Sequence, residues 1–433
     1  ISNPGHLGGM APALQACLTW FEERIYPGDI LINNDPYEGG SHLPDIFLFK
    51  PLFSGDKLIA WLCTMSHHTD VGGRVAGGNA CDSTEIYQEG LRIPPLKLYD
   101  KGVPSETLFA LIEKNVRLPG KVLGDMRAQI AANNIGEREF QALAGRYGAQ
   151  TVRRYMDALL DYTEKLAKEE ILSLPDGTYK FTDYVDADNI EEGPVVVQVA
   201  LTIKGDRILA DLEGSSPQVK AGINSPLTFT KSAVYGAVRL VMDPNIPNSA
   251  GYQRLIDVKA PEASVVAGVL PAACGARGIT GFRVMDAVTG ALGQAVPERV
   301  PADGEGGNSI LSIGGYKADG EAFAYVDLIC GVRGGRPTGD GPEGVPHPGA
   351  NISNTPIEIA EVELPIRIEE YGMIQDTGGP GGYFARLPGP LRPGQRECRP
   401  AFSCRSESGR NPAPRRRPDW GRCPEGCSVH CRC

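Results

Sequence analysis

Alternating hydrophobic and polar positions predict strands near the start of the chain. Three short runs rich in Ile, Leu and Phe, at 29–32, 46–49 and 58–62, are typical of β-strands. Ser54-Gly55-Asp56-Lys57 separates the last two runs and is a turn sequence. We therefore expect these two runs to pair as an antiparallel hairpin. An apolar, helix-like stretch lies within residues 1–20.

The pattern then changes twice. Between 105 and 174 apolar residues recur at helical spacing, with breaks expected at Gly120, Gly136 and Gly148. Strands are predicted after Pro175-Asp176-Gly177, at 179–185, 195–203 and 207–212. A helix is expected at 232–242, followed by short β segments and by a Gly/Pro-rich loop at 331–350. This order indicates a mixed α+β fold that is β-rich, with one helical region and irregular loops.

The last fifty residues differ from the rest in composition. Six of the eleven Cys lie in the last 36 residues, and the segment from Phe384 onward has eleven Arg, no Lys and four acidic residues. Three interpretations remain: a metal knuckle with non-standard spacing, a basic disordered arm, or frameshifted sequence, which we favour. We therefore expect three regions: 1–174 with the site, 175–382 as a β-rich part of the same domain, and the tail 383–433.

Charge and hydropathy exclude several classes of protein. The formal net charge is −10, which argues against a nucleic-acid partner. No apolar run reaches the roughly 18 residues that a membrane span needs, and no signal-type segment opens the chain. The five Cys outside the tail are scattered singly, as in reduced proteins. We expect a soluble, cytoplasmic protein.

Three of the six His lie close together in the predicted hairpin. Asp45 opens one strand and His67-His68 end its antiparallel neighbour, so pairing brings them together, and His42 can fold back around Pro44. Two imidazoles and a carboxylate with open positions are a ligand set for a catalytic divalent metal. Alternation lets only one of His67 and His68 bind, and we choose His68 as the ligand. Taken singly, each residue is more often a surface His or a turn Asp.

Other polar clusters are less specific. Asn34 and Asp35 are candidates for binding substrate, or belong to an Asx turn before Pro36. Glu89 and Arg92 are interpreted as a structural ion pair near a turn. The chain has no Walker-type phosphate-binding sequence, so any nucleotide chemistry must come from a partner.

Several long strings resemble the hydantoinase B/oxoprolinase family: Asn34–Asp45, Ser66–Gly73, Glu85–Pro95, Gly124–Gln129, Asn224–Pro226, Pro297–Ala302 and Gln375–Gly381. The resemblance covers residues 1 to about 382. Family members begin before Ile1 and continue after Tyr383 with Gly-rich β sequence, so this chain looks truncated and altered at its end.

The resemblance implies a partner, a hydantoinase A-like ATPase subunit, that phosphorylates a substrate oxygen. It also implies a metal held by His42, Asp45 and His68, with Mn²⁺ and Zn²⁺ as the first candidates. We expect ATP-dependent opening of a cyclic amide such as a hydantoin or 5-oxoproline, with Asp70 or His67 as proton acceptor. The alternatives are a ketone carboxylase subunit, which joins bicarbonate-derived CO2 to an enolate, and an inactive truncated product or binding scaffold.

Overall fold

The computed structural model describes residues 4–188, 190–191, 193–304, 309–373, 400–406 and 428–430. Among the described residues, helices make up 35% and strands 24%, in several sheets, which confirms the predicted α+β class. Among the described helices, none combines the length and the apolar character that crossing a bilayer requires.

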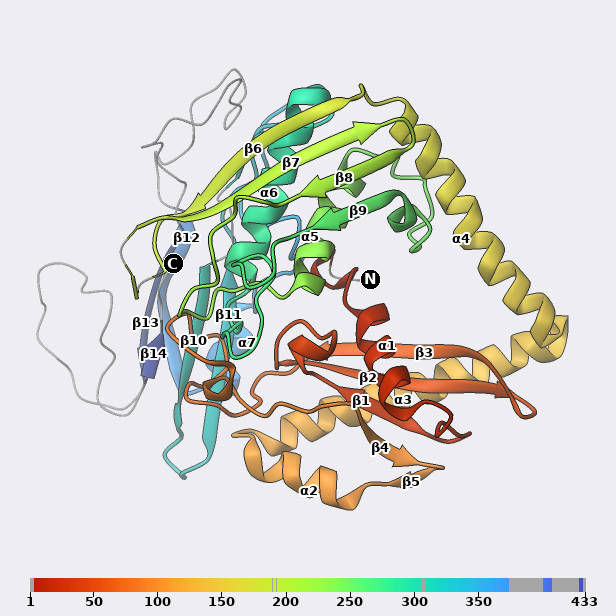
Figure 1. The fold of residues 1–433 in the computed structure, drawn as a ribbon. Coiled ribbons are helices and arrows are strands. Elements are labelled where there is room, and N and C mark those ends of the chain that lie inside the picture. Colours follow the sequence, from red (N-terminus) through yellow and green to blue (C-terminus); the bar gives the residue numbers. More distant parts are fainter. Residues whose placement is uncertain are drawn as a thin grey trace, which may run out of the picture.

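The first sheet is antiparallel and has the strand order β3-β2-β1-β4-β5 (Figure 1). Its strands are β1 (Ile30–Asn33), β2 (Asp45–Ser54), β3 (Lys57–His67), β4 (Leu96–Asp100) and β5 (Val103–Pro104). The predicted hairpin is confirmed: β2 pairs with β3 from Asp45↔His67 to Ser54↔Lys57, and Gly55 in the turn has φ 58°.

Helices cover both faces of this sheet, which is why β2 is apolar at successive positions. On one face Phe47 and Phe49 of β2 pack with α1 (Met10–Phe21). On the other face Ile46 and Leu48 belong to a core shared with α2 (Glu106–Asn115) and α3 (Pro119–Tyr147). A strand buried on both sides loses the polar alternation of a half-exposed strand.

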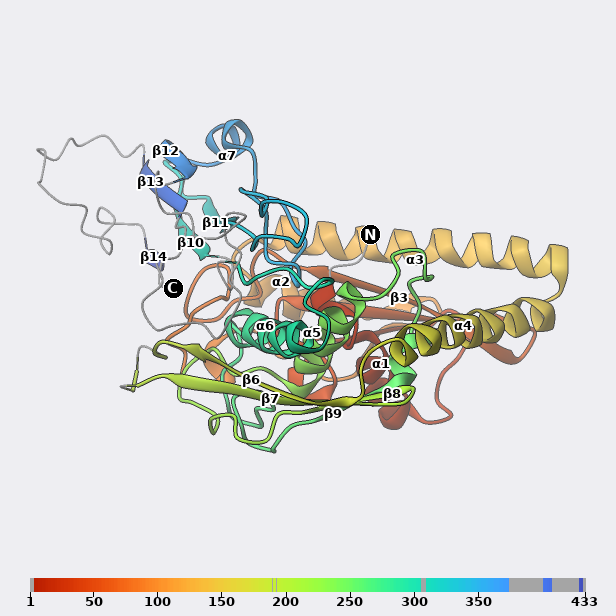
Figure 2. The ribbon, with the colours of Figure 1, turned by 90° about the horizontal axis from the view of Figure 1, so that it is seen from above.

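The predicted helical region forms α2, α3 and α4 (Ala149–Leu172), and the last two meet at one end and diverge from there (Figure 1 and Figure 2). Gly148, with φ 82°, separates them as expected. Gly120 and Gly136 do not break α3. A Cβ at Gly136 would lie 3.0 Å from the side chain of Leu62 in β3, so this glycine lets the helix approach the sheet.

The second sheet has the order β6-β7-β8-β9, and only its last pair is parallel. Its strands are β6 (Gly177–Val185), β7 (Val195–Lys204), β8 (Arg207–Asp211) and β9 (Ile256–Lys259). The buried face packs on α5 (Leu227–Leu240) and α6 (Gly278–Ala295), which lie between the two sheets (Figure 1).

The helix α6 was not expected, because the sequence suggested short β segments in this part. Most of its residues are buried, including six in succession from Val284 to Thr289. A helix buried nearly all round lacks the polar stripe on which helical periodicity depends. It also contains glycines at 278, 281, 290 and 293, and glycine lowers intrinsic helix propensity.

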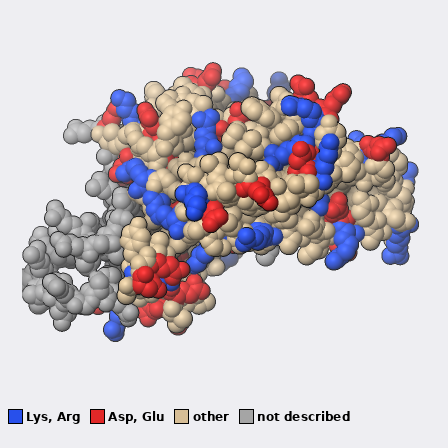
Figure 3. All heavy atoms as spheres, turned by 90° about the horizontal axis from the view of Figure 1, so that it is seen from below, with Lys and Arg blue, Asp and Glu red and all other residues tan. Residues whose placement is uncertain are grey.

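The C-terminal part adds β10 (Ser309–Tyr316), β11 (Ala322–Ile329), α7 (Ile357–Glu363) and β12 (Ile366–Met373). Strands β13 (Pro400–Ser406) and β14 (Ser428–His430) pair with β12 and β10. The rest of the predicted tail, including the Cys-rich run up to Cys427, lies outside the described residues. On the face in Figure 3, basic and acidic side chains of the described residues are interspersed rather than gathered into one basic surface.

Candidate metal centre

Two histidines and one aspartate come together at one end of the first sheet. Asp45 is the first residue of β2, His67 is the last residue of β3, and the two are directly paired. Directly paired residues point to the same face, so their side chains are neighbours. His42 lies three residues before Asp45. Ligand atoms of His42, Asp45 and His67 all lie within 4.8 Å of one another.

Close backbone packing holds the turn that carries His42. The N–H of Asp45 donates to the carbonyl of His42 at 3.0 Å and closes the turn. Gly39 has φ 88°, and a Cβ there would lie 2.5 Å from the backbone of Pro12 and Ala13 in α1. Only glycine fits such a position. The packing of α1 thus explains one of the glycines before His42.

Residues from the second half of the chain also contact the cluster. Nδ1 of His42 donates to the carbonyl of Gly275 at 3.0 Å, which leaves Nε2 of the ring 3.4 Å from Oδ2 of Asp45. At the start of α6, Nη2 of Arg277 donates to the same Asp45 oxygen at 2.7 Å, and Nε donates to Oγ of Ser41 at 2.8 Å. Fixing one imidazole nitrogen in this way orients the other.

Burial and charge set the protonation states. Burial, helped by Arg277, lowers the pKa of His42 to about 3, and burial also lowers the pKa of His6. Burial alone would raise the pKa of Asp45, but His6, His42 and Arg277 hold it well below its usual range. Because both histidines are neutral near pH 7, we attribute most of this effect to Arg277. The cluster therefore offers neutral imidazole and ionised carboxylate, the forms that bind metals.

Unpartnered polar atoms in the cluster fit a bound cation. Nε2 of His42 and Oδ1 of Asp45 are buried and have no hydrogen-bond partner. Leaving such an atom unpaired costs about 1–3 kcal/mol. Two imidazoles and one carboxylate, with further positions left for water or substrate, suit Zn²⁺ or Mn²⁺. The residues present therefore fit a divalent metal.

The structure brings His67, and not His68 as expected, within ligand distance of His42 and Asp45. His68 lies just after β3, and its Nε2 donates to Oε1 of Gln129 in α3 at 3.2 Å. His67 joins the cluster because it is the residue paired with Asp45, and alternation turns the next side chain away. Alternation indicated that only one of the two would bind, whereas the register decides which one.

Asp70, predicted as a proton acceptor, makes hydrogen bonds within its own loop and to Arg117. Its fully buried carboxylate accepts hydrogen bonds from the N–H groups of Gly72, Gly77 and Arg117. Nη1 of Arg117 also donates to it at 2.9 Å. Both oxygens are engaged and paired with a cation, so the contacts of Asp70 are structural.

Asn34 and Asp35, predicted to bind substrate, also make internal contacts. The side chain of Asn34 joins three backbone groups, those of Leu43, Leu91 and Ile93. Asp35 accepts the N–H of Tyr37 as the cap of η2 (Pro36–Glu38) and pairs with Arg92. These contacts match the alternative interpretation, an Asx turn before Pro36.

Two residues at or beside the cluster, His6 and Arg277, were missed from the sequence, and a third, Glu89, was expected only as the ion-pair partner of Arg92. His6 ends the 3₁₀ turn η1 (Pro4–His6), and its Nδ1 lies 3.6 Å from Oδ2 of Asp45. Its flanking glycines resemble those beside His42, and this is the feature of the sequence that could have pointed to His6. Nothing in the local sequence marks Arg277, because its partner Asp45 lies 232 residues away.

Glu89 joins the two halves of the chain at this site. It follows η3 (Ile86–Gln88), and its buried carboxylate accepts the N–H of Gly275 at 2.7 Å and the N–H of Cys274 at 3.1 Å. Gly275 in turn holds His42, so Glu89 supports the cluster through this loop. The ion pair expected between Glu89 and Arg92 is absent from the described contacts, where Arg92 pairs with Asp35.

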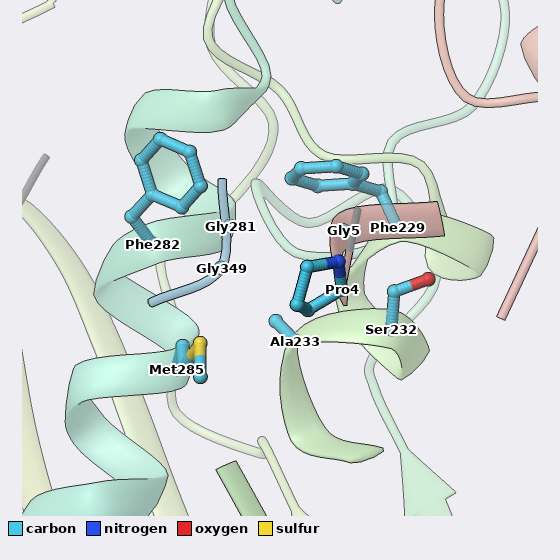
Figure 4. A pocket seen from close by; sticks show the side chains of 9 residues that line it. All are labelled: Pro4, Gly5, Phe229, Ser232, Ala233, Gly281, Phe282, Met285 and Gly349. Carbon is cyan, nitrogen blue, oxygen red and sulfur yellow. The ribbon is translucent and has the colours of Figure 1, made fainter. Parts of the chain in front are cut away.

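A small apolar cavity lies between η1, α5 and α6 (Figure 4). Phe229 and Phe282 line it from facing helices, with Met285 and Pro4 beside them. Its volume of about 10 Å³ is close to the minimum for one water molecule. It therefore has no room for a substrate in this conformation.

The fold and the cluster together define an α+β protein with a candidate two-histidine, one-aspartate metal centre. The profile of the hydantoinase B/oxoprolinase family matches residues 2–385, and the chain belongs to this family. The expectation from the sequence is thereby confirmed.

Comparison with individual proteins shows which members of the family this chain resembles. It is 34% identical, over 390 residues, to a putative D-/L-hydantoinase B subunit from Pseudomonas sp. (strain NS671), covering 87% of this chain and 65% of that relative. The structure of the ATP-dependent caprolactamase from Pseudomonas jessenii matches with TM-score 0.83 and 30% identity, over 88% of this chain and 67% of that one. The chain thus spans about two thirds of the length of these relatives.

A more distant structure shares the fold. The nucleotide-free structure of acetone carboxylase matches with TM-score 0.82 over 88% of this chain and 53% of that chain, at 18% identity. At that identity the likeness concerns the fold alone.

Proposed function

We propose that this chain is the metal-binding component of an ATP-dependent hydrolase that opens cyclic amides. The observation that carries the proposal is the convergence of His42, Asp45 and His67, with unpartnered donor atoms on His42 and Asp45. Relatives named as a hydantoinase B subunit and as an ATP-dependent caprolactamase support the reaction class. In this proposal a partner ATPase subunit phosphorylates the substrate, since the described residues include no nucleotide-binding sequence.

In this proposal His42, Asp45 and His67 hold a divalent metal. Such a metal polarises a carbonyl or phosphoryl oxygen and lowers the pKa of bound water to about 7. The chain's own residues prepare the site: Gly275 fixes the tautomer of His42, and Arg277 keeps Asp45 ionised. His67 is the exposed member of the cluster, so we propose that substrate approaches from its side.

Metal analysis of single variants tests the centre. We expect purified chain, dialysed against Mn²⁺ or Zn²⁺, to retain about one equivalent of metal, and His67→Ala to lose it. His68→Ala is the matched control, because it removes the neighbouring ring outside the cluster, and it should keep the metal. Loss of metal in His68→Ala with retention in His67→Ala would reverse the assignment.

Product analysis tests the reaction. Co-purified with its ATPase partner and given ATP and a hydantoin, 5-oxoproline or a lactam, the chain should yield the ring-opened acid, and His67→Ala should not. Labelled bicarbonate entering a ketone, without amide cleavage, would favour the carboxylase alternative instead. Failure of both reactions with a metal-loaded, well-folded protein would support the inactive product.

A further inference from the structure

The helix α4 carries a row of apolar side chains that no other part of the described chain covers. Tyr155, Leu159 and Tyr162 recur at the helical spacing i, i+4 and i+7, so they lie on one face. Their exposed fractions are 67%, 48% and 54%, and the neighbouring Met156 is 44% exposed. The helix runs along the edge of the molecule (Figure 1). Such spacing is typical of a helix face that packs against another surface.

Other residues attach α4 to the rest of the molecule. Thr163, Ala167 and Ile171 are buried in its second half. In its first half every residue from 153 to 159 is exposed, which is about two turns of helix. Neighbouring exposed apolar side chains mark surfaces that bind another protein, and Tyr and Met are enriched in such interfaces. The apolar row is therefore a candidate docking face.

The charges along α4 indicate which partner fits this face. Residues 149–156 include Arg153 and Arg154 and no acidic residue, whereas residues 157–164 include Asp157, Asp161 and Glu164 and no basic residue. If two copies of α4 pack antiparallel, the basic part of each helix lies along the acidic part of the other. A parallel pair would bring like charges together, which costs free energy. The pattern is therefore complementary to itself in the antiparallel orientation.

Several of these charged side chains are free to meet a partner. Arg153, Arg154 and Asp157 are exposed and form no ion pair within the part of the chain that the structure describes. The guanidinium of Arg154 lies 5.7 Å from the ring centre of Tyr155, so basic and aromatic groups adjoin. A two-fold dimer uses the same surface on both copies, so one self-complementary face is sufficient to form it.

We propose that the face of α4 formed by Tyr155, Met156, Leu159 and Tyr162 binds the same face of a second copy of this chain. The two helices pack antiparallel and form a two-fold dimer. The dimer does not depend on the proposed metal centre, whose residues lie on other elements. It gives a role to four exposed apolar side chains that the proposed reaction does not use.

Sedimentation equilibrium of the full chain tests the dimer. We expect a reversible monomer–dimer equilibrium in the wild type. Leu159→Asp should raise the dimer dissociation constant at least about 30-fold, since it places a charge at the centre of the apolar row. Ile135→Asp is the matched control, because it makes the same kind of change at an exposed residue of α3. Its dissociation constant should equal that of the wild type.

Charge reversal tests the antiparallel orientation. The double variants Arg153→Glu with Arg154→Glu, and Asp157→Lys with Asp161→Lys, should each be monomeric, because like charges then face each other. An equal mixture of the two should dimerise again, since each reversed part meets its opposite. Thermal unfolding checks that both variants are folded.

Two results would overturn the inference. One is a dimer that persists in Leu159→Asp, because the contact would then lie on another face. The other is a wild type that stays monomeric at its highest soluble concentration. A monomer that buries this face only after its ATPase partner is added would assign the face to that partner instead of to a second copy.

Discussion

At the scale of single residues, Glu89 shows how one side chain supports the geometry of the neighbouring candidate site. Its carboxylate receives two backbone N–H groups from the loop that orients His42 and carries Arg277. Burial nevertheless raises the pKa of Glu89 to about 7, because those hydrogen bonds only partly offset the lost solvation. The group therefore titrates in a range where few carboxyls do.

The raised pKa of Glu89 predicts that stability depends on pH. A carboxyl whose folded-state pKa lies above its unfolded value of 4.5 contributes stability at low pH and loses it as pH rises through about 7. Between pH 5 and pH 8 we expect the metal-free wild type to lose roughly 2–3 kcal/mol more unfolding free energy than Glu89→Gln. Urea unfolding at both pH values measures this.

The comparison with Glu89→Gln cancels the effect of the buried histidines. His6, His42 and His68 have lowered pKa values and act in the opposite sense, destabilising both proteins equally as pH falls below 6.5. Parallel stability profiles for the two proteins would mean that Glu89 ionises as an ordinary surface carboxyl.

At the scale of elements, the long helix α4 is fixed to the second half by a close backbone contact. Gly251, just before η4 (Tyr252–Leu255), is buried against α4, and a Cβ there would lie 2.1 Å from the carbonyl oxygen of Leu160. The backbone angle φ of Gly251 is an ordinary −56°, so the demand for glycine comes from space alone.

Gly251 makes this contact and Gly145 makes none, so replacing each with alanine should change stability in opposite directions. Gly251→Ala should destabilise the protein by about 1–3 kcal/mol, because the helix must move away. Gly145→Ala, at an exposed position of α3 with nothing within 4 Å, should stabilise it by about 0.5–1 kcal/mol. Chemical denaturation of the two variants measures both. A neutral Gly251→Ala would show that α4 does not depend on this contact.

At the scale of the whole molecule, the candidate site belongs to both halves. His42, Asp45 and His67 come from the first sheet, whereas Gly275 and Arg277 come from the loop before α6. Such a site does not exist in an unfolded or half-folded chain, so metal binding should stabilise the molecule as a unit.

The rise in unfolding free energy on metal binding measures how far the metal stabilises the folded molecule. With free Mn²⁺ at 100 times its dissociation constant, the unfolding free energy of the wild type should rise by about 2.7 kcal/mol. His42→Ala should show no such rise. Mn²⁺ is the better probe, because Zn²⁺ also binds the cysteines of the unfolded chain. Tight binding without any gain in stability would mean that the unfolded chain binds Mn²⁺ equally well, and it would contradict a site that forms only on folding.

Much of the fold could be predicted from the sequence because it depends on local pattern. The hairpin of β2 and β3 was visible from two apolar runs around a turn, and the break at Gly148 from one glycine in a long helical pattern. The helix α6 was not visible, because burial nearly all round removes the polar face that reveals a helix.

The sequence by itself determined the fold class, the family and the segment, 42–68, that carries the candidate metal ligands. It led us to expect His68 as the ligand, whereas the structure places His67 beside Asp45, since that choice depends on which residue pairs with Asp45 in the ladder. Nor could it bring His6, Glu89 and Arg277 to the cluster. Those approaches depend on packing between segments up to 232 residues apart, which only the folded chain establishes.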